Sequence, residues 1–108
     1  MGDYRKLIAY QKAFYLAMEI LELTKAFPKE EKYCLIDQIR RSSRSVCTNF
    51  VEAYKRRRYR NHFISKLNDA ETQVWLEFSL AYKYISAEKF RELTSQNDEI
   101  AKLILYYT

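Results

Sequence analysis

Apolar residues recur every three or four positions along most of the chain, which is the spacing of a helix face. The first such stretch runs from about Tyr4 to Ala26. Its predicted inner face comprises Leu7, Tyr10, Ala13, Phe14, Ala17, Ile20, Leu21 and Thr24. Pro28 ends this helix because proline disfavours helical backbone at the residue before it. The acids Glu30 and Glu31 that follow suit the positive end of a second helix.

The rest of the sequence predicts three more amphipathic helices with short connections. The second reaches at least Ala53, and its face comprises Leu35, Ile39, Ser42, Ser43, Val46, Phe50 and Ala53. The third has Asn61 as its N-cap, and its face comprises Phe63, Leu67, Ala70, Val74, Phe78, Ala81 and Ile85. Ser86 caps the fourth, whose face comprises Phe90, Leu93, Asn97, Ile100, Ile104 and Tyr107. Four such helices predict an all-α fold, an antiparallel up-down four-helix bundle.

Composition supports this fold class. The only glycine among the 108 residues is Gly2, so folds that need tight glycine turns, including multi-hairpin sheets, Rossmann units and Walker-type phosphate loops, are disfavoured. A hydrophobic content of 48% is enough to build one core at this length. We therefore expect a single domain over residues 1–108.

Each predicted helix also carries apolar residues outside its inner face. They are Ile8, Tyr15, Ile36, Ile64, Trp75, Leu76, Tyr82, Leu105 and Tyr106. A bundle of this size needs only one apolar face per helix, and tyrosine and tryptophan are enriched in interface cores. The surplus predicts self-association. The alternative is that these residues merely widen the apolar stripes, since much of any protein surface is apolar.

Positive charge is concentrated in residues 40–60, which hold eight cations against one acid, Glu52. A concentrated basic patch indicates a polyanionic partner, most often nucleic acid, with anionic membrane surfaces and acidic proteins as alternatives. Helical geometry directs Arg41, Arg44 and Lys55 outward and places Arg40 on the flank, and Asp37 can pair with Arg41 one turn away. The predicted RNA- or DNA-binding residues are Arg40, Arg41, Arg44, Lys55, Arg56, Arg57, Arg58, Tyr59 and Arg60.

Enzymatic chemistry is not indicated, and we expect no catalytic residue, metal or cofactor. The one histidine, His62, has no Glu-x-x-His partner of the kind that bundle metal sites use. Glu71 and Glu77 could form an acid and base pair, but six residues separate them on the helix, so solvated or interface acids are the favoured interpretation. Cys34 and Cys47 are interpreted as small buried or half-buried thiols without metal-binding spacing.

The sequence has no apolar stretch of membrane-spanning length and no secretory signal at its start, which predicts a cytoplasmic protein without membrane partners. Two functions remain open from the residues alone. One is electrostatic binding of RNA or DNA through residues 40–60, and the other is a protein-protein interaction scaffold without a direct nucleic-acid role.

The sequence resembles the 23S rRNA intervening-sequence proteins, a family of four-helix-bundle proteins similar to the accessory variability proteins of diversity-generating retroelements. The resemblance rests on the opening Tyr4 to Ala13, the connection Ala26 to Glu31, the run Gln38 to Val46 continuing into Asn49 and Glu52, and the stretch Ala70 to Leu76. It implies a homopentamer, a non-enzymatic role, and contact with nucleic acid and a reverse transcriptase. The motif residues Gln38, Asn49 and Glu52 would serve either assembly or binding. Ala53 stands where the family usually has glycine, so the second helix can extend into the basic run.

Overall fold

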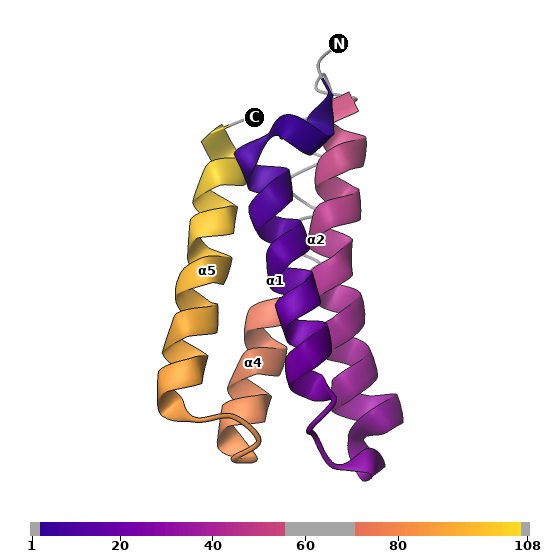
Figure 1. The fold of residues 1–108 in the computed structure, drawn as a ribbon, viewed down its shortest axis with the longest axis vertical. Coiled ribbons are helices and arrows are strands. Elements are labelled where there is room, and N and C mark those ends of the chain that lie inside the picture. The colour runs from indigo at the N-terminus through magenta and orange to yellow at the C-terminus, as the bar shows by residue number, and fades with distance from the viewer. Residues whose placement is uncertain (1–2, 56–70, 107–108) are drawn as a thin grey trace.

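The computed structural model describes residues 3–55 and 71–106, and these residues are all helical or in connecting loops (Figure 1). The α-helices are α1 (Ile8–Thr24), α2 (Asp37–Lys55), α4 (Thr72–Ala81) and α5 (Ala87–Tyr106). In Figure 1 their directions alternate along the chain, which is consistent with the expected up-down arrangement. The all-α prediction is confirmed for the described part of the chain. Within the same ranges, no helix is long and apolar enough to cross a membrane.

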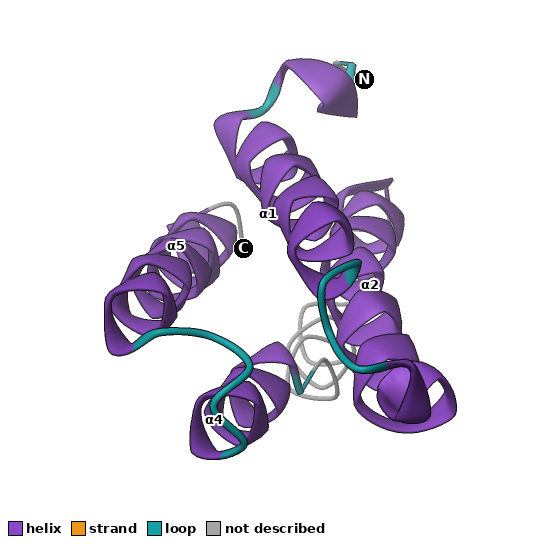
Figure 2. Cartoon of the chain, turned by 60° about the horizontal axis from the view of Figure 1, so that its bottom comes forward, coloured by secondary structure: helices purple, strands orange, loops and turns teal. Residues whose placement is uncertain are grey.

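The helices occupy the corners of a bundle. Helix α1 packs against α2 and α5, and α4 packs against the same two helices. Helices α1 and α4 therefore lie at opposite corners, as the tilted view in Figure 2 shows. This separation matters below, because the outward faces of α1 and α4 point away from each other.

Each of the four helix pairs is joined by a polar side-chain contact in addition to apolar packing. The contacts are Arg40 to Thr24 at 2.8 Å, Thr72 to Ser42 at 3.2 Å, Gln73 to Thr94 at 3.1 Å and Gln96 to Glu19 at 3.1 Å. Hydrogen bonds have strict geometry, so these contacts fix the axial register of each helix relative to its neighbour. Lys89 also contacts Glu19 across the α1–α5 seam, at 3.3 Å.

The beginnings of the first two helices differ from the sequence prediction. Residues Tyr4–Lys6 form a separate turn of 3-10 helix, in which the Arg5 N–H donates to the Asp3 carboxylate at 3.0 Å. Helix α1 begins only at Ile8 because Leu7 is extended. After Pro28 the chain forms a 3-10 turn at Lys29–Glu31 and a wider π turn at Lys32–Ile36, and regular α-helix starts at Asp37. Helix α2 does reach past Ala53, as predicted.

The turn between α4 and α5 is made without glycine. Lys83 adopts a φ of 65°, the left-handed region that glycine usually occupies after a helix. The Tyr84 N–H donates to the Ser79 carbonyl at 2.9 Å, and the Lys83 N–H donates to the Leu80 carbonyl at 2.9 Å. These two bonds satisfy the last carbonyls of α4 and reverse the chain. Ser86 then caps α5 by accepting from the Lys89 N–H at 3.0 Å, which confirms the predicted cap.

The core consists of two adjoining clusters. The larger contains Ala9, Ala13, Leu16, Ile20, Ile39, Val46, Cys47, Phe50, Leu76, Leu93, Ile100 and Ile104. The smaller, near the α1–α2 and α4–α5 connections, contains Phe27, Leu35, Ile36 and Ile85. The predicted inner faces of the second and fourth helices are largely confirmed, since Leu35, Ile39, Ser43, Val46, Phe50, Leu93, Ile100 and Ile104 are all buried. The side chains of Ala53 and Tyr107 lie outside the described part.

The predicted inner face of α1 was wrong in its centre. The buried stripe is Ala9, Ala13, Leu16, Ile20 and Thr24, whereas Phe14 is 51% exposed. The reason is that α1 is apolar on two adjoining faces, so spacing alone does not decide which face enters the core.

The same error occurs in α4. Val74, Phe78 and Ala81 are exposed, and the buried residues are Thr72, Leu76 and Ser79. Thr72 and Ser79 satisfy their hydroxyls by hydrogen bonds to Ser42 and to the Trp75 carbonyl, so they can occupy the core side. Asn61, Phe63, Leu67 and Ala70 of the predicted third helix lie outside the described residues.

Two residues assigned to the surplus apolar set are instead core residues, namely Ile36 and Leu76. Others are exposed as predicted, namely Ile8, Tyr15, Tyr82, Leu105 and Tyr106. Trp75 is half-buried and Ile64 lies outside the described part.

The two cysteines differ from each other. Cys47 is buried, but Cys34 is exposed, contrary to the prediction that both are buried or half-buried.

Candidate nucleic-acid interface and apolar groove

The outward face of α2 carries cations. Arg41, Arg44 and Lys55 are exposed, as the helical spacing predicts. Arg41 pairs with Asp37 at 3.6 Å across one turn, an exposed ion pair worth only a few tenths of a kcal/mol. Within residues 3–55 and 71–106, the side chains of Arg44 and Lys55 form no ion pair. Most of the positive charge on this face is therefore uncompensated by nearby carboxylates of the described part.

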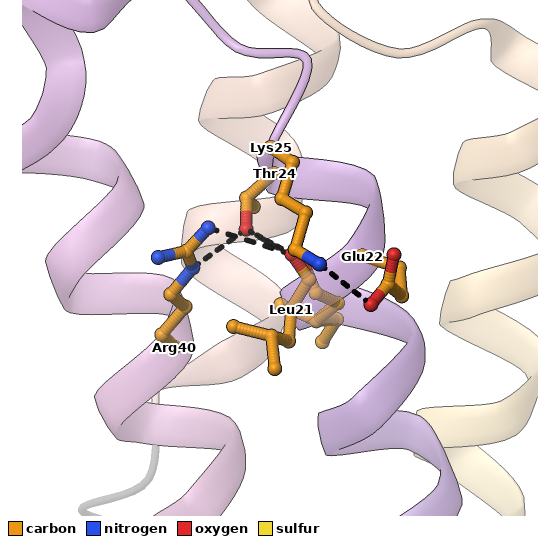
Figure 3. A network of polar contacts seen from close by, with 6 residues as sticks. Leu21, Glu22, Thr24, Lys25 and Arg40 are labelled. Atoms are coloured by element: carbon orange, nitrogen blue, oxygen red, sulfur yellow. Dashed lines mark hydrogen bonds and ion pairs between the residues drawn. The ribbon is translucent and has the colours of Figure 1, made fainter.

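Arg40 behaves differently from its neighbours. Its guanidinium crosses to the end of α1, where Nε donates to Thr24 Oγ1 at 2.8 Å and Nη2 donates to the Leu21 carbonyl at 3.4 Å (Figure 3). Thr24 is itself buried and donates to the Ile20 carbonyl at 2.8 Å. A cation beside the last carbonyls of a helix also interacts favourably with the negative end of the helix dipole. Arg40 thus joins α1 to α2 inside one subunit.

The structure describes only some of the other predicted site residues. Among the motif residues, Gln38 and Glu52 are exposed and Asn49 is half-buried, all on α2. The predicted binding residues Arg56, Arg57, Arg58, Tyr59 and Arg60 lie outside the described residues. The structure therefore gathers Arg41, Arg44 and Lys55 on one helix and assigns Arg40 contacts within the subunit.

A groove of about 580 Å³ runs between α1 and α2 beside these cations. Its apolar lining includes Tyr10, Phe14, Met18 and Leu21 from α1 and Val51 from α2. Arg40, Arg44 and Lys55 also line it, together with one acid, Glu52. We call this feature the α1–α2 groove. Half of the residues that the periodicity assigned to the α1 inner face are thus groove residues, namely Tyr10, Phe14, Ala17 and Leu21.

Aromatic rings follow one another along one end of the groove. The ring centroids of Tyr4 and Tyr10 are 5.2 Å apart, and those of Tyr10 and Phe14 are 5.9 Å apart. Lys55 Nζ lies 5.3 Å from the Tyr4 ring centroid, a cation–π distance.

Desolvation by the surrounding protein raises the pKa of the Cys47 thiol to about 11, so this groove-lining cysteine stays protonated at neutral pH.

The two carboxylates that could form an acid and base pair are both exposed. Glu71 precedes α4 as its N-cap residue, and Glu77 lies within the helix. No group of three or more histidine, cysteine, aspartate or glutamate side chains in the described ranges could hold a metal ion. His62 lies outside those ranges.

The fold and site together define a small all-α protein with a cationic helix face beside an apolar groove. Residues 5–106 match the family model of 23S rRNA-intervening sequence proteins, and the chain belongs to this family. It is also similar to a solved protein of unknown function from the S23 ribosomal protein family of Bacteroides thetaiotaomicron. The two chains are 30% identical with a TM-score of 0.73, over 92% of this chain and 93% of the other. No curated protein matches the sequence.

Proposed function

We propose that this protein is a non-enzymatic helical-bundle adaptor that forms a homo-oligomer and binds RNA or DNA electrostatically through residues 40–60. The resemblance stated above supports a homopentamer and a reverse transcriptase as a protein partner. A cytoplasmic location is part of the same proposal. The alternating helix directions support a complete up-down bundle as the subunit. Binding proceeds by neutralising phosphates, so it carries little sequence preference.

The observation that carries this proposal is the exposed cationic face of α2. Arg44 and Lys55 have no carboxylate partner within the described part of the chain, and Arg41 has only an exposed one. Arginine forks match phosphate oxygens in bidentate geometry. Repetition of this face in a symmetric oligomer makes binding multivalent, which raises the overall affinity without new contacts.

The test compares two double variants that remove the same charge from different helices. Arg41→Gln with Arg44→Gln alters the α2 face, and Arg91→Gln with Lys102→Gln alters exposed cations of α5. Fluorescence anisotropy with a short unstructured single-stranded RNA, and with DNA of the same sequence, measures affinity over a range of salt concentrations. Removing one cation that neutralises a phosphate makes the slope of log K against log salt shallower by about 0.7.

We expect the α2 variant to bind more weakly with a shallower slope, and the α5 variant to bind as the wild type does. An equal loss of affinity in both variants would mean that net charge, and not the α2 face, causes the binding. Wild-type binding by the α2 variant would remove Arg41 and Arg44 from the interface, and circular dichroism checks that both variants keep their helicity.

The apolar groove favours a second candidate, a protein-interaction scaffold in which nucleic acid has no direct role. Affinity capture from a lysate with and without nuclease separates the two. Partners that survive nuclease treatment favour the scaffold, and partners that disappear favour the nucleic-acid adaptor.

A further inference from the structure

Helix α4 and its C-cap residue Tyr82 present an apolar ridge that has two acids next to it. Val74, Phe78 and Tyr82 follow one another at intervals of four residues and are 43%, 42% and 52% exposed. Glu71, the N-cap residue of α4, lies at the N-terminal end of this row, and Glu77 lies on one side of it by helical spacing. Both acids are exposed, and neither forms an ion pair within the described ranges. The Phe78 ring lies 5.7 Å from Trp75 and 5.8 Å from Tyr82, centroid to centroid. We call the three apolar residues and the two acids the α4 ridge.

The α1–α2 groove has the complementary character. It is apolar along its centre, where Phe14 is 51% and Met18 46% exposed, and its charged lining is mainly cationic. Amphipathic helices bind in such grooves through apolar anchors that recur every three or four residues along one helix face. The α4 ridge supplies anchors at this spacing, and its acids suit Lys55, the last residue of α2, which leaves Arg41 and Arg44 to contact phosphates. Charge complementarity of this kind sets orientation and excludes wrong partners.

One subunit cannot fill its own groove with its own ridge. Helix α1 lies diagonally across the bundle from α4 (Figure 2), and its contacts are with α2 and α5. A contact between two different surfaces of identical subunits is heterologous, and it produces a closed ring when the rotation between subunits closes. A groove and a ridge on opposite sides of the bundle are the two halves of such a contact.

We propose that the α1–α2 groove of one subunit binds the α4 ridge of a second copy of this chain, head to tail. This inference rests on the self-association in the proposed function and specifies the surfaces that produce it. It accounts for two exposed aromatic surfaces with one contact, and it places Arg44 at the border between the subunit interface and the cationic face of α2. A nucleic acid in the groove would leave the α4 ridge uncovered, so the second copy is the favoured occupant.

The test uses one variant for each half of the contact. Phe14→Asp puts a charge in the groove and leaves the ridge intact, and Phe78→Asp puts a charge on the ridge and leaves the groove intact. Both side chains are half exposed in the subunit, so the core is not altered. Tyr15→Asp is the matched control, because Tyr15 is an aromatic residue of α1 that is 64% exposed and does not line the groove.

Native mass spectrometry should give an oligomer for wild type and for Tyr15→Asp, and a monomer for each of the other variants. An equimolar mixture of Phe14→Asp and Phe78→Asp should give a dimer with one copy of each and nothing larger. Its only intact contact joins the ridge of the first variant to the groove of the second. Circular dichroism confirms folding, and the neutral pair Met18→Gln and Val74→Gln replaces any variant that fails to fold.

The outcomes separate this inference from the proposed function. A monomeric wild type overturns the self-association in both. An oligomeric wild type whose mass is unchanged by Phe14→Asp and by Phe78→Asp overturns only the groove and ridge contact. Phe14→Asp that keeps its oligomeric mass but no longer binds RNA would assign the groove to nucleic acid and contradict the proposal.

Discussion

The two apolar stripes of α1 lie on the same helix but differ in composition and in surroundings. One stripe, Ala9, Ala13, Leu16 and Ile20, is buried against α2 and α5. The other, Tyr10, Phe14, Met18 and Leu21, lines the α1–α2 groove and is half exposed at Phe14 and Met18. The difference shows that one helix can have two roles. The first stripe stabilises the subunit, and the second presents a surface to a partner. Substitutions in the two stripes should therefore differ in kind.

The largest effect on stability is expected in the buried stripe. Ile20→Ala removes a side chain with no exposed surface from the larger cluster and should lower the free energy of unfolding by about 2–5 kcal/mol, because reduced burial and a cavity add together. Ile8→Ala on the exposed side of the same helix should cost below about 0.5 kcal/mol. Urea unfolding followed by circular dichroism measures both, at a protein concentration where the variants have the same mass. Equal destabilisation would contradict the division of α1 into two stripes.

A smaller effect is expected at the link between α1 and α2. Arg40→Met keeps an apolar stem but removes the donors to Thr24 and Leu21, and should lower the free energy of unfolding by about 1.5–3 kcal/mol, the range for hydrogen bonds to a charged group. Arg41→Met breaks only the exposed pair with Asp37 and should cost below about 0.5 kcal/mol. The same unfolding measurement applies. A greater destabilisation at Arg41 would reverse the roles assigned to these neighbouring arginines.

The turn after α4 offers a stabilising substitution. Lys83→Gly relieves the cost of a non-glycine residue in the left-handed region and should raise the free energy of unfolding by about 1 kcal/mol. Thermal unfolding compares it with Lys83→Ala, which keeps the backbone cost and removes only the side chain. Stabilisation by alanine as large as that by glycine would assign the effect to the lysine side chain instead.

The smallest effect near neutral pH concerns the two cysteines. Burial raises the pKa of Cys47 from 9.0 to about 11, so the folded protein holds a proton there that the unfolded chain releases. Stability from this group is complete below about pH 9 and is lost as the pH rises toward about 11. At pH 8 a thiol reagent should modify exposed Cys34 well before Cys47, as mass spectrometry of the labelled peptides would show. Equal labelling rates would mean that the groove opens readily.

Much of the fold could be predicted from the sequence, because helices α2 and α5 each have one apolar face. Their buried residues Ile39, Phe50, Leu93 and Ile100 fall where the spacing indicates. The inner faces of α1 and α4 could not be predicted in this way. Helix α1 has two apolar faces, and α4 has threonine and serine on its core side. In both helices the difference between apolar and polar faces, on which assignment by periodicity depends, is therefore lost.

The sequence predicted which cations of the candidate site are exposed, but it did not predict the contacts between helices that shape the site. Helical spacing correctly directed Arg41, Arg44 and Lys55 to the surface, because three residues on one regular helix have a fixed relation. The contact of Arg40 with Thr24 could not be predicted, since it joins residues 16 positions apart on different helices. The α1–α2 groove also depends on how two helices pack, and its residues Tyr10, Phe14 and Leu21 were expected in the inner face of the first helix instead.

Hydroxyl-radical footprinting of the wild-type protein over a range of concentrations tests the second role of α1 most directly. We predict that Phe14, Met18 and Phe78 become protected together as concentration rises, while Tyr15, the neighbour of Phe14 on the same helix, stays equally reactive. Protection of Tyr15 with none at Phe14 or Phe78, or unchanged reactivity at all four residues in an oligomer, would contradict that role.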